Sequence, residues 1–136
     1  MPNMFDCAAG FVVSAVLCDR IEELEPGVHR FFEANITCKG GEKSAKRYWL
    51  FQIRNLVNAI DGEKSVLRVS EVTGTYFSFG LGEGVKPEMV IHKEMVEGMC
   101  VWMDERFSDF FMLDELFEFI RKKRLTRLDS WEVFAE

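Results

Sequence analysis

The strongest secondary-structure signal in this chain is the stretch Tyr48-Trp49-Leu50-Phe51-Gln52-Ile53-Arg54. Trp49, Phe51 and Ile53 lie on one face of an extended backbone, and the residues between them lie on the other face. Aromatic and β-branched side chains favour such a pleated, half-buried surface. The stretch therefore predicts a strand from Tyr48 to Val57 in the middle of a sheet.

Turn residues divide the following part of the chain into shorter strands. Asp61-Gly62 and Thr73-Gly74 are turn dipeptides. The apolar patterns around them predict strands at Ser65–Val72, Thr75–Phe79, Met89–Ile91 and Met99–Met103. Short strands joined by tight turns form a meander with antiparallel neighbours.

Each end of the chain predicts a strand, a helix and a second strand. The first unit has a strand at Gly10–Val13, a helix that Ser14 caps and Pro26-Gly27 ends, and an alternating strand at Phe32–Ile36. The second unit has a helix from an Asp114 cap to about Arg124 and a strand around Trp131 to Phe134. The similar pattern of the two units indicates a weak internal duplication. The predicted fold class is α+β, a mostly antiparallel sheet flanked by two main helices, with a strand-helix-strand unit at each end.

The chain has the size and composition of a single domain, residues 1–136. Apolar residues make up 48% of it, with 13 Phe and 3 Trp, which is enough to fill a core without disulfides or metals. The four cysteines form no Cys-x-x-Cys pair, and the sequence lacks a secretion signal or a run of 18 apolar residues. We therefore expect a cytoplasmic protein that does not interact with a membrane.

The charge balance limits the partners that the chain can bind. Asp and Glu number 23 against 17 Lys and Arg, which gives a formal net charge of -6. Binding to nucleic acid requires a basic surface that displaces counterions from phosphates, so we expect no nucleic-acid partner. An acidic surface instead accelerates the encounter with a basic protein.

Residues that could support catalysis or bind a metal are few and scattered. The glycine run from Gly80 to Gly84 lacks the spacing of a phosphate-binding loop. His29 and His92 have no second ligand at metal-binding helical spacing, and adjacent carboxylates such as Glu22 and Glu23 point in different directions. The sequence therefore predicts no catalytic, cofactor-binding or metal site and no enzymatic activity.

A longer motif resembles a known family. The aromatic strand leads into Val57-Asn58-Ala59-Ile60-Asp61-Gly62-Glu63-Lys64-Ser65, which is similar to the N-A-I-D-x-E-K-S signature of a large family of bacterial immunity proteins from polymorphic toxin systems. Phe11-Val12-Val13-Ser14 and Asp114-Glu115-Leu116 also resemble that family, and the likeness covers Phe11 to Phe134. The resemblance implies a cytoplasmic protein that binds and neutralises a cognate toxin domain, without cofactor or catalysis.

Acidic and aromatic residues are the predicted partner contacts, because negative charge attracts a basic partner and aromatic side chains anchor interfaces. The residues assigned to this role are Glu22, Glu23, Glu25, Asp61, Glu63, Trp102, Asp104 and Glu105. The D-x-E-K-S motif is equally compatible with a structural turn. Two alternatives remain open: a small-molecule-binding domain or enzyme with an acidic cleft near His29 or His92, and a structural or regulatory homodimer.

Overall fold

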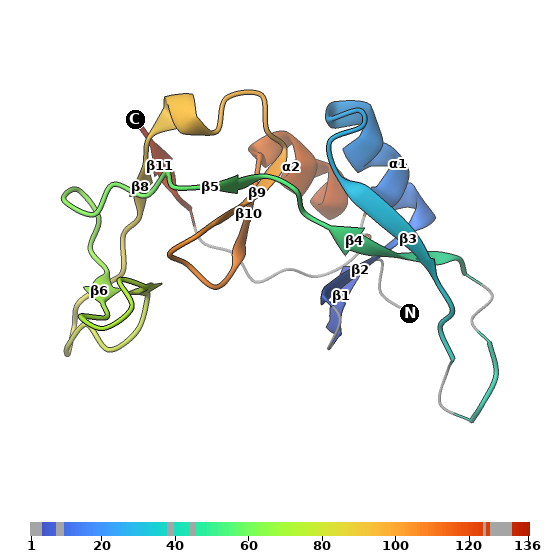
Figure 1. Cartoon of the computed structure of the whole chain (residues 1–136), viewed down its shortest axis with the longest axis horizontal. Helices are drawn as coiled ribbons and strands as arrows, with labels where there is room; N and C mark the ends of the chain where they lie inside the picture. The colour runs from blue at the N-terminus through green and yellow to red at the C-terminus, as the bar shows by residue number, and fades with distance from the viewer. Residues whose placement is uncertain (1–3, 8–9, 38–39, 44–45, 124, 126–131) are drawn as a thin grey trace.

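The computed structural model describes residues 4–7, 10–37, 40–43, 46–123, 125 and 132–136. A four-stranded antiparallel sheet lies at one end of the molecule (Figure 1). Its strands lie in the order β1 (Met4–Cys7), β2 (Gly10–Ser14), β4 (Tyr48–Gln52) and β3 (Arg30–Ala34). Phe51 of β4 lies opposite Phe11 of β2 and Phe31 of β3. This confirms the prediction that the aromatic strand is an inner strand.

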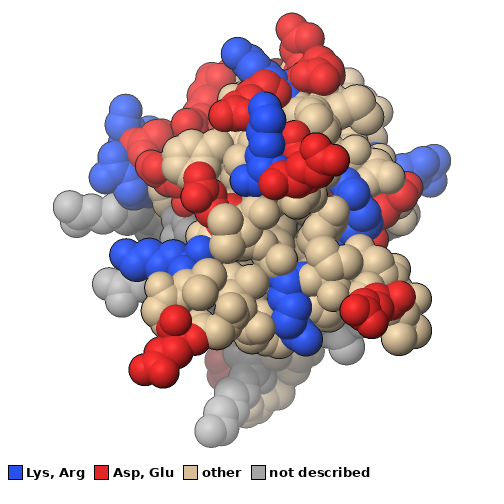
Figure 2. Space-filling model, turned by 90° about the vertical axis from the view of Figure 1, so that its left-hand side faces the viewer, with Lys and Arg blue, Asp and Glu red and all other residues tan. Residues whose placement is uncertain are grey.

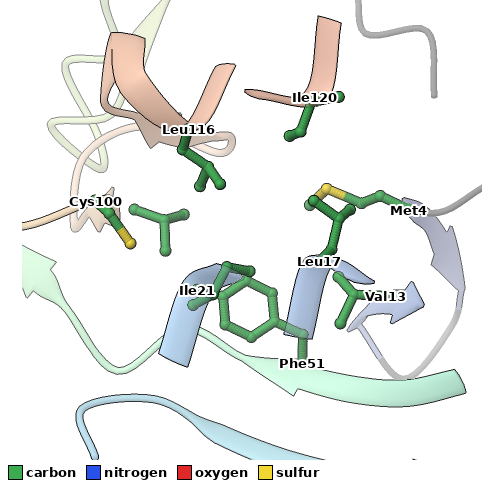
Figure 3. Packing of buried hydrophobic residues seen from close by; sticks show 9 residues of the cluster. Met4, Val13, Leu17, Ile21, Phe51, Cys100, Leu116 and Ile120 are labelled. Atoms are coloured by element: carbon green, nitrogen blue, oxygen red, sulfur yellow. The ribbon is translucent and has the colours of Figure 1, made fainter. Parts of the chain in front are cut away.

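Two helices build the main core over this sheet. In α1 (Ala15–Leu24), Leu17 and Ile21 are buried, and in α2 (Asp114–Lys122), Leu116 and Ile120 are buried. Figure 3 shows these four side chains converging with Phe51 from the sheet. Full burial of such a side chain contributes roughly 1.5–3 kcal/mol, so this cluster is a major source of stability.

Both helices begin without the predicted side-chain cap. Ser14 is at the cap position of α1, but its buried hydroxyl makes no capping hydrogen bond and has no hydrogen-bond partner. The residue at the cap position of α2 is Leu113, and Asp114 is the first helical residue. The predicted Asp114 cap is therefore wrong by one residue, although its negative charge in the first turn still complements the helix dipole.

The remaining strands of the described residues form three smaller sheets. The first has the order β10 (Phe110–Met112), β9 (Val101–Asp104) and β5 (Leu56–Val57), in which β9 pairs antiparallel with β10 and parallel with β5. The others pair β8 (Val90–Ile91) in parallel with β11 (Phe134–Ala135), and β6 (Arg68–Val69) antiparallel with β7 (Tyr76–Phe77). A short helix, η1 (Lys93–Met95), follows β8. A second core lies here, and its members include Trp102 stacked on Phe111 at 5.8 Å.

The fold class is α+β as predicted, with mostly antiparallel pairing. The predicted single strand Tyr48–Val57 is in fact two strands, since β4 ends at Gln52 and β5 begins at Leu56. Phe32 is half exposed and Phe31 packs against the core, so the prediction that Phe32 faces inward is wrong, whereas Ala34 and Ile36 are half-buried as predicted. The predicted strand around Trp131 lies partly outside the described residues, and the internal duplication stays a prediction. In the described part of the chain, no helix has both the length and the apolar character needed to span a bilayer.

Candidate functional site

Glu25 is the first of two buried carboxylates that fix strand β9. It follows α1 directly, and its side chain is 5% exposed. Its Oε1 accepts hydrogen bonds from the backbone N–H groups of Cys100 at 2.7 Å and Val101 at 3.3 Å, and from His29 Nε2 at 3.0 Å. Its Oε2 accepts a hydrogen bond at 2.8 Å from Asn55 Nδ2, which also donates to the Val101 carbonyl. The carboxylate therefore joins the end of α1 to the start of β9.

His29 completes this network in its neutral form. The backbone N–H of Arg54 donates to His29 Nδ1 at 3.1 Å, so that Nδ1 must carry a lone pair. The ring proton is consequently on Nε2, which donates to Glu25. The side chain is fully buried, and both ring nitrogens already have partners. His29 is thus part of the structural network and does not line an acidic cleft.

The same network explains why β4 and β5 are separate strands. Arg54 and Asn55 lie between the two strands, and their polar groups bond to His29, Glu25 and the Val101 carbonyl. The ladder of the first sheet stops where these bonds begin. The backbone then continues into the second sheet, where the N–H of Met103 donates to the Asn55 carbonyl at 2.9 Å.

The pKa values of Glu25 and Cys100 favour a structural role for this cluster over a catalytic or metal-binding one. Burial would raise the pKa of Glu25, but hydrogen bonds from Cys100, Asn55 and His29 outweigh burial and lower it to about 2. Burial and the adjacent Glu25 raise the pKa of the Cys100 thiol. One donor atom each from Glu25, His29 and Cys100 lies within 4.8 Å of the others, a spacing that could hold a metal ion. However, the thiolate is the nucleophilic and metal-binding form, and it is disfavoured here.

Asp104 is the second buried carboxylate and lies at the opposite end of β9. Its side chain is 1% exposed. Oδ2 accepts hydrogen bonds from the backbone N–H groups of Ala59 at 2.8 Å and Ile60 at 3.1 Å, and Oδ1 accepts one from Arg106 N–H at 2.9 Å. The Arg106 guanidinium donates to the Ile60 carbonyl at 2.8 Å and lies over the ring of Tyr76. Asp104 therefore fixes the residues that lead into the D-x-E-K-S motif.

The D-x-E-K-S motif forms a turn. Asp61 Oδ1 accepts hydrogen bonds from the backbone N–H groups of Glu63 at 3.1 Å and Lys64 at 3.2 Å. The Ser65 hydroxyl accepts a hydrogen bond from the Val90 N–H at 2.9 Å and donates to the Val90 carbonyl at 3.2 Å. These contacts attach the turn to β8 and support a structural role for Asp61 and Ser65. The Glu63 side chain is exposed.

The structure divides the eight predicted contact residues into two groups. Glu25, Trp102 and Asp104 are buried, which corrects the expectation that they present side chains to a partner. Their hydrogen-bonding and packing partners inside the chain account for their presence. The other five are at least partly accessible and lie in three places, on α1, in the motif turn and just after β9: Glu22, Glu23, Asp61, Glu63 and Glu105.

The acidic end of α1 also has partners within the chain. Arg20 forms ion pairs of 3.0 Å with Glu23 on its own helix and with Glu115 on α2. Glu22 accepts a hydrogen bond at 3.3 Å from the N–H of Gly27, just after the helix. Together with the buried Glu25, these contacts explain why negative charge is tolerated at this helix end without a partner protein.

An open groove that sequence reasoning missed lies between β9–β10, the start of α2, the segment after η1 and the C-terminal strand. Its volume is about 1250 Å³. We call it the acidic groove, because the described residues that line it include six with carboxylate side chains and, as the one basic residue among them, Lys93. The acidic residues are Glu97, Asp109, Asp114, Glu115, Glu118 and Glu132. They come from three stretches of the sequence, at residue 97, residues 109–118 and residue 132, so no single motif contains them all.

The fold and its buried networks define a small α+β domain whose main polar clusters serve its own structure. The chain matches the family model described as Immunity protein family (Imm11) over residues 1–134, and it belongs to that family. This confirms the resemblance noted from the sequence and supports a role in toxin immunity in general. Comparisons with the curated proteins and with the solved structures find no match.

Proposed function

We propose that this chain binds a cognate toxin domain in the cytoplasm and neutralises it without catalysing a reaction. The observation that carries the proposal is membership of the immunity protein family over residues 1–134. Immunity by binding requires a stable surface complementary to the toxin, and it needs neither a cofactor nor a nucleophile.

The surface charge supports binding of a basic protein. The net charge of -6 makes the chain a negative partner at neutral pH. Figure 2 shows acidic side chains concentrated in the upper part of the β6–β8 end of the molecule, with basic side chains among them. Such a distribution accelerates encounter with a positively charged toxin domain.

The two histidines give weak support to an enzymatic alternative. His29 is buried with both nitrogens bonded. His92 is 46% exposed, and its Nε2 lies 3.8 Å from Asp61 Oδ2. The other oxygen of Asp61, Oδ1, accepts the hydrogen bonds of the motif turn. Neither arrangement supplies a nucleophile within reach of a free base.

The proposal is tested by co-expressing the chain with candidate toxin domains, beginning with any that a neighbouring gene encodes. We expect the chain to restore growth of cells that the toxin alone arrests, and calorimetry to give nanomolar affinity, about -12 kcal/mol. An unrelated acidic protein of similar size serves as the control. Continued growth arrest together with no measurable binding would refute the proposal.

A further inference from the structure

Among the residues that the structure describes, the acidic groove has more carboxylates than the ion pairs of the chain neutralise. Glu115 pairs with Arg20, and Glu118 pairs with Arg121 at 2.6 Å. Within the residues that the structure describes, no ion pair is recorded for the other four acidic residues. These are Glu97, Asp109, Asp114 and Glu132, and all four are exposed.

Local structure accounts for only part of this charge, since Asp109 Oδ1 accepts a hydrogen bond from the Phe110 N–H at 2.8 Å. The helix dipole favours an acidic residue in the first turn, which explains Asp114. Glu97 follows η1, Asp109 precedes β10, and Glu132 precedes β11. None of these three is in the first turn of a helix, yet the fold brings them to one groove. Concentrating like charges costs free energy unless a partner of opposite charge compensates for it.

The groove also has an apolar lining suited to a protein partner. Half-buried phenylalanine and methionine side chains lie along it: Met99, Phe107, Phe110, Met112 and Phe117. Aromatic and methionine side chains are enriched in protein interfaces, and methionine adapts its shape to a partner. An apolar surface bordered by carboxylates matches a segment in which Lys or Arg side chains alternate with apolar ones.

We infer that the acidic groove binds a basic, partly apolar segment of the toxin domain, an inference that rests on the function proposed above. The charge of the groove selects this occupant over a second copy of the chain. Each copy has a net charge of -6, so self-association meets long-range repulsion, whereas a basic toxin is attracted.

Charge reversal in the groove tests the inference against the toxin domain that the co-expression experiment identifies. The test variant combines Glu97→Lys, Asp109→Lys and Glu132→Lys. The matched control combines Glu42→Lys, Glu71→Lys and Glu83→Lys, three exposed residues that do not line the groove and that change the net charge equally. The milder variant E97Q/D109N/E132Q keeps side-chain size and is used if the first does not fold by circular dichroism.

We expect the groove variant to weaken toxin binding roughly 100-fold and the control to change it less than about 5-fold. The Gln/Asn variant should weaken binding by about 10-fold and show a smaller dependence on salt than the wild type. Equal losses in groove and control variants, or wild-type affinity in the groove variant, would overturn the inference. The inference would also be overturned if the wild type sedimented as a dimer and the groove variant did not, while that variant kept its affinity for the toxin. In all these cases the wild type still protects cells, whereas failure of the proposed function removes protection and binding together.

Discussion

Replacing Glu25 with Gln should destabilise the fold by about 3 kcal/mol at pH 7. The substitution keeps the size of the side chain but removes its charge and turns one oxygen into an N–H donor. The four donors that now bond to the carboxylate would lose charge assistance, at roughly 0.8 kcal/mol each and about 3 kcal/mol in total. If the nitrogen of the new amide faces Asn55 Nδ2, two N–H donors point at each other with no acceptor between them.

The lowered pKa of Glu25, which the same hydrogen bonds cause, corresponds to a similar magnitude. Its ordinary value of 4.5 is lowered to about 2 in the folded chain, a difference equivalent to about 3 kcal/mol. Because the folded pKa is the lower one, this stabilisation is fully present above about pH 5. It decreases as the pH falls towards 2, and about half of it remains at pH 3. The free energy difference between wild type and Glu25→Gln should therefore shrink as the pH is lowered.

Urea unfolding between pH 3 and pH 7, followed by tryptophan fluorescence, measures this difference. Trp102 is buried and stacked on Phe111, so its emission should change on unfolding. Glu22→Gln is the matched control one turn earlier on the helix, and it should change stability by less than about 0.5 kcal/mol. A loss below about 1 kcal/mol for Glu25→Gln, or a loss that does not vary with pH, would show that the network does not depend on an ionised Glu25.

Three further substitutions test the other structural roles. Asp104→Asn should destabilise the fold by about 2–3 kcal/mol in urea unfolding, because Oδ2 accepts two backbone N–H groups that an amide nitrogen would repel; a neutral result would contradict its role in fixing β9. Asp61→Ala should cost about 1 kcal/mol through loss of the turn bonds, whereas Glu63→Ala should cost less than about 0.5 kcal/mol, and equal effects would argue against a structural Asp61. Gly62→Ala should destabilise the fold by about 1 kcal/mol, because the new methyl group would overlap the Tyr76 hydroxyl. Adding Tyr76→Phe to the same chain should restore much of that stability. If it does not, the overlap with Tyr76 is not the cause of the loss.

The fold was predictable wherever one side of an element faces a core. The alternation around Phe51 identified the inner strand, and the helical spacing of Leu17, Ile21, Leu116 and Ile120 identified both helices. These patterns are local consequences of burial. The division of the aromatic strand was not predictable, because it depends on bonds from Arg54 and Asn55 to residues 25–46 positions away in sequence.

The candidate site was less predictable than the fold, since its residues are scattered along the chain. Acidic residues adjacent in sequence were easily noticed, but adjacency does not distinguish a buried carboxylate such as Glu25 from an exposed one such as Glu23. A glutamate just after a helix and a histidine four residues later is a weak signal of a buried pair, and it could have identified Glu25 and His29. No comparable signal identifies the acidic groove, whose residues are brought together by β9, β10, α2, the segment after η1 and the C-terminal strand.

The buried carboxylate and the groove are linked through the start of β9. Cys100 donates its N–H to Glu25 and also lines the acidic groove. The donors around Glu25 are amides and a neutral imidazole, so they stabilise its negative charge without cancelling it. With a pKa of about 2, Glu25 stays ionised throughout the physiological range, and its field is screened less in the interior than in water. If a basic segment binds in the groove, Glu25 therefore also attracts it electrostatically, in addition to fixing β9.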